Sequence, residues 1–343
     1  MAVTWTVDDI PDQTGRTAVV TGASSGLGLI TAAQLARHGA TVLMAVRDVA
    51  KGERARTELV GDLEVHQLDL ADLGSVRAFA DTLHRQGRRI DVLVNNAGTG
   101  TAPQRQLSAQ GHELIFATNH LGHFALTGLL LDLFRPGQDP RVVNVGSNLY
   151  RQMRDTLDVD DLADPASYSP GTAYVRSKVA TVLFGAELDR RLRAAGRPVR
   201  SFLAHPGMAN TPMHDAAHTF AQRAMVAITK PLLSRSAEHG ALPLLFAATS
   251  PDAATGVFLG PTRNKRDLRV HFAPLVAPGD DLGAARRLWS LSEKLSGVPY
   301  LSSVPYPPSA GLDADPAGFG KSAPDGDAAT DGRAVPIGGE QLR

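Results

Sequence analysis

The segment Arg16–Gly39 constrains the fold most, because it has the order of strand, glycine turn and helix. Arg16–Thr21 is a short apolar run rich in β-branched residues, and an apolar helical pattern follows the turn. The glycines Gly22, Gly26 and Gly28 let the backbone turn tightly and let a ligand approach it closely. Free N–H groups and the dipole at a helix start attract phosphate. The segment therefore predicts a site for the pyrophosphate of a dinucleotide.

Apolar runs and helical patterns continue to alternate after this segment. Further strands are expected at 41–46, 64–68, 91–95, 141–145, 199–204 and 257–260, and helices at 49–60, 71–86, 114–134 and 173–195. Such alternation requires a parallel sheet with right-handed crossovers and helices on both faces. We expect an α/β protein with a doubly wound parallel sheet, a Rossmann fold of about seven strands, in a single domain. Its ligands should bind at the carboxyl ends of the strands.

Composition excludes several classes of function. The formal net charge is zero, so the chain has no excess of positive charge that would attract nucleic acid. The chain has no cysteine, which removes disulfides and cysteine-ligated metal sites. His214 and His218 lie four apart but lack a third ligand, so we predict no metal. The N-terminus lacks a secretory signal, and no run reaches the ~18 apolar residues of a membrane span. We expect a cytoplasmic protein.

Three sets of polar residues are candidates for catalysis: the pair Tyr174 and Lys178, then Ser147, and then Asn119. Tyr174 and Lys178 lie four apart on a predicted helix, so they share a face. An ammonium should lower the pKa of the phenol and make the pair a general acid/base. Ser147 follows a strand, where its hydroxyl can bind a substrate oxygen or serve only as a turn or cap residue. Asn119 is an amide within an apolar helix, and a satisfied core amide is its alternative interpretation.

These motifs stand in the order and spacing of the short-chain dehydrogenase/reductase family, which residues 15–260 resemble. They are TGASSGLG at 21–28, Asp69-Leu70, NNAG at 95–98, Asn119, Ser147, Tyr174 with Lys178, and His205-Pro206-Gly207 followed by Thr211. Residues 116–131 and 288–300 look like the branch that holds retinol dehydrogenases, the WW-domain oxidoreductase and protochlorophyllide reductase.

The resemblance implies a role for each catalytic residue. Tyr174 would be the acid/base, and Lys178 would lower its pKa and hold the nicotinamide ribose. Ser147 would orient the carbonyl or alcohol oxygen, and Asn119 would support a water that links Lys178 to solvent. The hydride chemistry belongs to the cofactor, while the protein supplies orientation and electrostatics.

The resemblance also implies a cofactor site. Thr211, with the turn at Pro206 and Gly207, would contact the nicotinamide carboxamide, and Asp69 would bind the adenine. The cofactor-binding residues expected are Gly22, Ser24, Ser25, Gly26, Leu27, Gly28, Arg47, Asp69, Leu70, Asn96, Ala97, Gly98, Tyr174, Lys178, Pro206, Gly207 and Thr211.

The end of the second strand bears on cofactor choice. An NAD enzyme usually has an acidic residue there, whereas this chain has Val46 followed by Arg47. A guanidinium can pair with a 2′-phosphate. We predict NADP, with NAD as the alternative, since Asp48 weakens the preference and Arg47 can instead be a solvated surface residue.

The chain departs from the family pattern in two places. Gly146 replaces the serine that commonly precedes the catalytic one, a change that should leave Ser147 in place. Tyr174 follows Ser147 by 27 positions, about twice the commonest spacing, so the polar insertion 149–170 must loop out near the site.

The remaining segments complete the expected organisation: an N-terminal arm at 1–14, a catalytic domain at 15–301 and a disordered tail at 302–343, which is rich in Pro, Gly, Ala and Asp. Residues 208–233 would cover the substrate, as such a segment does in this family. Their apolar side chains, three methionines among them, favour a lipophilic or cyclic alcohol, ketone or aldehyde, although a helix packed on the core explains them nearly as well.

The resulting hypothesis is an NADP-dependent oxidoreductase that moves a hydride between nicotinamide and a carbonyl or alcohol. The alternative is a catalytically silent NADP(H)-binding sensor or scaffold. Many relatives associate through the long helices that correspond to 114–134 and 173–195, but the branch also has monomers, so the resemblance leaves open a homodimer or homotetramer and a monomer.

Overall fold

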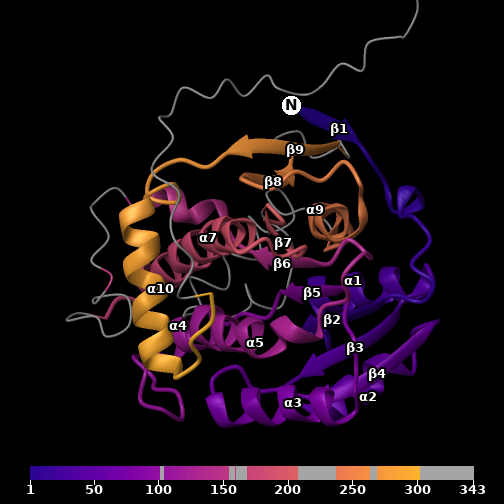
Figure 1. Ribbon diagram of the computed structural model, residues 1–343, viewed down its shortest axis with the longest axis horizontal. Helices are drawn as coiled ribbons and strands as arrows, with labels where there is room; N and C mark the ends of the chain where they lie inside the picture. Colours follow the sequence, from indigo (N-terminus) through magenta and orange to yellow (C-terminus); the bar gives the residue numbers. More distant parts are fainter. Residues whose placement is uncertain (101–103, 154–158, 160–167, 208–236, 263–268, 302–343) are drawn as a thin grey trace, which may run out of the picture. The chain divides into compact units, whose positions relative to one another are not determined.

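The computed structural model describes residues 1–100, 104–153, 159, 168–207, 237–262 and 269–301. A nine-stranded sheet lies at the centre of these residues (Figure 1). Its strands are β1 Ala2–Thr4, β2 Thr17–Thr21, β3 Thr41–Val46, β4 Asp62–Gln67, β5 Val92–Asn95, β6 Arg141–Val145, β7 Arg200–Ala204, β8 Val257–Pro261 and β9 Arg269–Pro274. Their order across the sheet is β1-β9-β8-β7-β6-β5-β2-β3-β4.

The predicted count of about seven strands was too low by the two strands at one edge. β2 to β8 are parallel and correspond to the predicted strands, whereas β9 pairs antiparallel with β8 and with β1. β1 has only three residues, and Val3 pairs with Val270 from the other end of the chain. No local pattern announces such a pairing. Trp5, which follows β1, is buried edge-on against Phe246 and fixes the strand to the core.

Helices cover both faces of the sheet, as expected for a doubly wound fold. They are η1 Val7–Asp9, α1 Gly26–Arg37, α2 Val49–Arg56, α3 Leu73–Arg85, α4 Leu114–Phe116, η2 Ala117–Leu121, α5 Gly122–Leu130, η3 Leu131–Leu133, η4 Asn148–Gln152, α7 Pro170–Ala194, α9 Ala237–Thr249 and α10 Leu282–Ser296. Side chains of Asp48, Asp72 and Asp281 cap α2, α3 and α10 by accepting amides of their first turns.

Alternate strand residues enter two separate cores. Val19 and Leu93 face α3, α5, α7 and α10, while their neighbours Val20 and Val94 face α1 and α9. Both faces of the central strands are therefore apolar, which is why they read as continuous hydrophobic runs.

The helix predicted at 114–134 is not continuous. It divides into α4, the π-helical turn η2, α5 and the short η3, and the amide of Gly122 bonds to the carbonyl of Ala117, five residues back. A Cβ at Gly122 would lie 2.3 Å from the carbonyl oxygen of Leu70, so the turn brings the helix very close to the loop after β4. The apolar pattern continues through this turn and therefore conceals it.

The same stretch, Leu114–Leu133, is long and apolar enough to cross a membrane by length and composition alone. Its most apolar window is 78% buried within the protein, which is the burial expected of a core helix.

Helix α10 packs on α5 and α7, beside which it lies in Figure 1. Its Trp289 contacts Phe124 and Phe184, and the hydroxyl of Tyr300 donates to the carbonyl of Phe124 at 3.1 Å. The face of α5 and α7 that α10 covers is therefore not free for a second copy of the chain. A homodimer or homotetramer stays a prediction.

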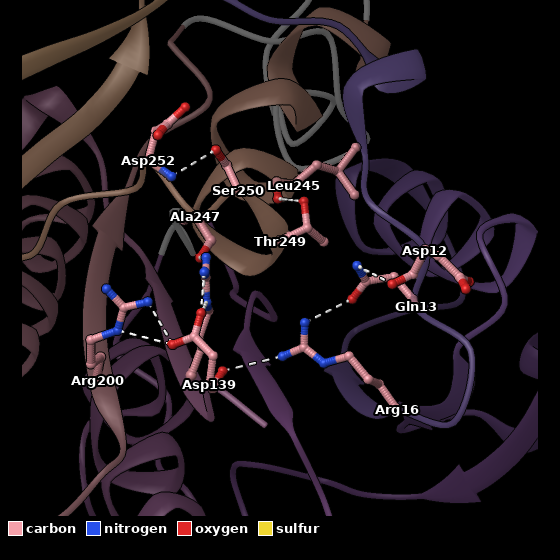
Figure 2. A network of polar contacts seen from close by, with 11 residues as sticks. Asp12, Gln13, Arg16, Asp139, Arg200, Leu245, Ala247, Thr249, Ser250 and Asp252 are labelled. Atoms are coloured by element: carbon pink, nitrogen blue, oxygen red, sulfur yellow. Dashed lines mark hydrogen bonds and ion pairs between the residues drawn. The ribbon is translucent and has the colours of Figure 1, made fainter. Parts of the chain in front are cut away.

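Asp139 joins three strands at their amino ends. Its carboxylate accepts hydrogen bonds from Arg141 and Arg200, which begin β6 and β7, and its carbonyl accepts one from Arg16, just before β2. Figure 2 shows Asp139 between Arg200 and Arg16. The opposite, carboxyl end of the sheet carries the candidate site.

Candidate active site

A cleft of about 1080 Å³ opens at the carboxyl ends of the parallel strands. Every predicted cofactor-binding residue that the structure describes lines it: Gly22, Ser24, Ser25, Gly26, Leu27, Gly28, Arg47, Asp69, Leu70, Asn96, Ala97, Gly98, Tyr174, Lys178, Pro206 and Gly207. Ser147 lines it as well. Thr211, His214, His218, residues 208–233, most of 154–167 and the tail 302–343 lie outside the described residues.

The glycine turn between β2 and α1 needs its glycines for two different reasons. Gly22 and Gly26 have φ angles of 69° and 57°, in the left-handed region that favours glycine. A Cβ at Gly28 would instead lie 2.5 Å from both the carbonyl oxygen of Gly22 and the side-chain nitrogen Nδ2 of Asn96. The third glycine thus allows α1 to pack against the turn, whereas we predicted the same two roles for all three glycines, a tight turn and close approach of a ligand.

Tyr174 and Ser147 meet at the wall of the cleft. Tyr174 lies in the second turn of α7, whereas Ser147 follows β6 by two residues and caps η4 by accepting the amide of Leu149 at 3.3 Å. Both side chains line the cleft, and the Ser147 side chain lies near enough to the phenol to act on the pKa of Tyr174. The two hydroxyls therefore lie side by side, as the predicted acid/base pair requires.

Lys178 is buried one turn beyond Tyr174. Its ammonium lies 5.8 Å from the centre of the Tyr174 ring and donates a hydrogen bond to the carbonyl of Val145 at 3.0 Å. The lysine is only 4% exposed, so its charge is held in the wall of the cleft, beside the phenol.

Burial sets the protonation of both groups. It raises the pKa of Tyr174 to about 12, against the smaller, opposite effect of the Ser147 side chain, and it lowers the pKa of Lys178 to about 8. The expected lowering of the tyrosine pKa by Lys178 is therefore not found, because burial raises this pKa and Ser147, not Lys178, is the group that opposes the rise. Tyr174 is a protonated acid at neutral pH.

Asn119 lies in η2, behind the cleft wall, and is 2% exposed. Its side chain accepts the amide of Thr99 at 2.8 Å and donates to the carbonyl of Thr99 at 3.1 Å and to the hydroxyl of Ser177 at 2.9 Å. Ser177 in turn donates to the carbonyl of Tyr174 at 2.8 Å. Asn119 is thus a satisfied amide that connects the loop after β5 to the helical turn of Tyr174.

Sequence reasoning missed Lys51, Thr99, Thr118 and Gln152, which also line the cleft. Lys51 was detectable, because Asp48 is an N-cap whose carboxylate accepts the Lys51 amide at 2.9 Å. This cap directs the start of α2 toward the glycine turn, where the Lys51 ammonium lies 3.4 Å from the hydroxyl of Ser25. Among the described residues, no group of three His, Asp or Glu side chains could hold a metal ion.

Comparison with known proteins agrees with this geometry. Residues 16–159 match the family model described as short chain dehydrogenase. Human retinol dehydrogenase 14 is 36% identical over 311 residues, which cover 83% of this chain and 87% of that protein. The chain belongs to the short-chain dehydrogenase/reductase family. It resembles the retinol dehydrogenase branch and is an NAD(P)-dependent dehydrogenase or reductase.

Solved structures of short-chain dehydrogenases share this fold. The crystal structure of an uncharacterized protein from Mycobacterium paratuberculosis is 41% identical, covers 87% of this chain and all of its own, and has a TM-score of 0.71. The Pseudomonas aeruginosa RhlG/NADP active-site complex is 27% identical, covers 72% of this chain and 94% of its own, and has a TM-score of 0.56.

Proposed function

We propose that this oxidoreductase uses NADP(H) to reduce the carbonyl group of a lipophilic or cyclic substrate, or to oxidise the corresponding alcohol, with Tyr174 as the acid/base. The observation that carries the proposal is that Tyr174, Ser147 and Lys178 line the wall of one dinucleotide-sized cleft together. A hydroxyl pair at one point can hold a single substrate oxygen from two sides.

The residues present fit a dinucleotide. The glycine turn exposes backbone to the cleft, and Lys178 stands beside Tyr174, where ribose hydroxyls would lie. The cofactor, when bound, supplies or accepts the hydride.

The protein's own groups handle the substrate oxygen and its proton. In reduction, the Ser147 hydroxyl donates a hydrogen bond to the carbonyl oxygen, and the protonated Tyr174 transfers its proton to that oxygen as the carbon receives the hydride. The phenolate left behind is stabilised by the nearby Lys178 ammonium. Oxidation runs the same steps backwards, and the phenolate then takes the alcohol proton.

Arg47 and Lys51 support the choice of NADP. Both line the cleft beside the glycine turn, and Val46 puts no carboxylate at the end of β3. The Asp48 carboxylate, which could have opposed a phosphate, is used to cap α2. Two cations near one point favour a 2′-phosphate over a 2′-hydroxyl. The structural likeness to an NADP complex agrees with this proposal.

A lipophilic substrate is supported by the cleft and by a relative. Leu114 and Leu149 line the cleft, and Leu149 is 38% exposed at its edge. The human relative is named for retinol, which is a lipophilic alcohol.

The test measures wild-type oxidation of NADPH and of NADH with a panel of lipophilic and cyclic ketones, aldehydes and quinones. We expect turnover of at least one carbonyl, with a kcat/KM for NADPH at least ~10-fold above that for NADH. Tight NADPH binding without turnover of any panel member would favour the sensor interpretation instead. A preference for NADH would contradict the roles of Arg47 and Lys51.

A further inference from the structure

Gly146, which replaces the family's usual serine, is packed against an aromatic ring. A Cβ at this position would lie 2.9 Å from Cζ of Phe258 and 3.3 Å from Cγ2 of Val182. The first distance is shorter than packed carbon atoms tolerate. The Phe258 ring therefore occupies the space that a side chain at position 146 would need.

This ring has little freedom to move away. Phe258 lies in β8 and is fully buried, in register with Leu203 of β7. Tyr150 packs edge-on against it with the ring centres 5.5 Å apart, and the His205 ring lies 4.6 Å away. Tyr150 is itself anchored, because its hydroxyl accepts the amide of Val276 at 3.3 Å. A collision at position 146 must thus displace the backbone or disrupt this aromatic cluster.

The backbone at Gly146 leads directly to the reacting groups. The amide of Gly146 donates to the carbonyl of Ala204 at 2.8 Å, and Ser147 is the next residue. The amide of Tyr150 donates to the carbonyl of Ser147 at 3.1 Å, so the same cluster also holds η4. A shift at Gly146 therefore moves the Ser147 hydroxyl relative to Tyr174.

The other side of the ring supports the turn at the cofactor cleft. Nδ1 of His205 accepts the amide of Gly207 at 3.1 Å, and Pro206 and Gly207 line the cleft. One ring thus contacts both the segment of Ser147 and the imidazole that holds this turn.

We propose that Phe258 is a positioning residue, whose ring against Gly146 aims the Ser147 hydroxyl at Tyr174 while supporting the His205–Gly207 turn. Phe258 touches no reacting atom and acts through Gly146 and His205. Gly146 and Phe258 are accordingly a matched pair, in which the missing side chain makes room for the ring. The expected effect on turnover rests on the proposed function, whereas the expected effect on the position of the Ser147 hydroxyl does not.

The test compares the wild type with Gly146→Ala, Phe258→Leu and the double variant. Leucine lacks the Cζ atom that a Cβ at 146 would meet, so the double variant should relieve the collision. Gly128→Ala is the matched control, because a Cβ there would lie 2.4 Å from the Tyr300 ring, remote from the cleft. Melting temperature and NADPH binding are measured for each variant, so that activity refers to folded, binding-competent protein.

The first readout is a crystal structure of each variant and needs no activity. We expect the Ser147 and Tyr174 hydroxyls to lie farther apart in Gly146→Ala than in the wild type, and to return to the wild-type separation in the double variant. An unchanged separation in Gly146→Ala would overturn the proposal, and so would an increased separation that the added Phe258→Leu change does not reverse.

The second readout is kinetic. Gly146→Ala should lower kcat by about 10- to 100-fold, because small misplacements of reacting groups are costly. The KM for NADPH should change by less than ~3-fold, and the double variant should recover most of kcat. Gly128→Ala should lower only the melting temperature. If the wild type turns over no carbonyl, the proposed function fails, but the crystal structures still decide the geometric claim. Equal kcat in Gly146→Ala and wild type would overturn the catalytic claim.

Discussion

Ser147 and Tyr174 line the wall of one cleft although they lie 27 positions apart, one after β6 and the other in α7. Burial keeps the pKa of Tyr174 near 12, so the phenol is a proton donor at neutral pH. Lys178, whose burial lowers its pKa to about 8, is the group beside it that titrates near neutrality.

The first prediction concerns the pH dependence of carbonyl reduction. We expect kcat/KM to stay level between pH 6 and about 7, since Tyr174 is protonated and Lys178 is charged there, and to fall through about pH 8 as Lys178 loses its proton. Initial rates in constant-ionic-strength buffers measure this profile. The activity that Lys178→Arg retains should stay level to higher pH, because a guanidinium stays charged. A wild-type profile level to pH 10 would contradict this role of Lys178.

The second prediction concerns Lys51. Lys51→Ala should raise the KM for NADPH by about 10-fold and leave the KM for NADH nearly unchanged, because only NADPH carries the 2′-phosphate that the ammonium would pair with. Lys294→Ala, an exposed lysine on α10, is the matched control and should change neither value. Equal effects on both cofactors would place Lys51 away from the 2′-phosphate.

The third prediction concerns stability in acid. Burial lowers the pKa of His123 to about 4 and that of His120 to about 3, so folding holds both histidines neutral. Their contribution is complete above pH ~6.5 and is lost as the pH falls towards 4, because the unfolded chain then binds more protons. The free energy of unfolding should fall by up to ~1.4 kcal/mol per pH unit for each histidine.

Urea unfolding at pH 7, 6, 5 and 4.5 measures that slope. His123 also bridges the carbonyl of Asn119 at 3.1 Å and the hydroxyl of Thr21 at 2.9 Å, so His123→Gln should be less stable at pH 7 and show a shallower slope below pH 6.5. A slope unaltered by this substitution would show that His123 titrates normally.

The fourth prediction concerns Asp139. Although burial alone would raise its pKa, the bonds and charges of Arg141 and Arg200 hold the pKa of Asp139 below its ordinary value. Arg141 is 1% exposed, so Asp139→Ala leaves a buried guanidinium without its carboxylate and should cost about 3–5 kcal/mol of unfolding free energy. Asp132→Ala removes the partner of Arg197 at an exposed site and should cost less than ~1 kcal/mol. Similar losses in both variants would contradict this account.

The residues that could be predicted from the sequence act through local geometry. The turn Gly22–Gly28 and the pair Tyr174 and Lys178 are recognisable because backbone conformation or helical spacing determines what each does. The parallel strands are recognisable because both of their faces are apolar. The family resemblance then assigned roles that spacing alone left open.

The features that escaped prediction depend on contacts between distant segments. β1 becomes a strand only because β9 is beside it, and Gly146 shows its purpose only against Phe258. The protonation of Tyr174 also required the structure, because burial raises the pKa of the phenol, whereas the sequence suggested that Lys178 lowers it. The domain limits, the cytoplasmic location and the roles of Thr211 and residues 208–233 stay predictions.

The most direct test of the central claim is the turnover of Tyr174→Phe with saturating NADPH and the best carbonyl substrate. Tyr300→Phe is the matched control, since it loses a hydroxyl that donates a hydrogen bond to the carbonyl of Phe124, and Tyr300 is not among the described residues that line the cleft. We predict that Tyr174→Phe still binds NADPH but loses at least ~100-fold in kcat, while Tyr300→Phe retains wild-type turnover. Turnover of Tyr174→Phe equal to that of the wild type would contradict the assignment of Tyr174 as the acid/base.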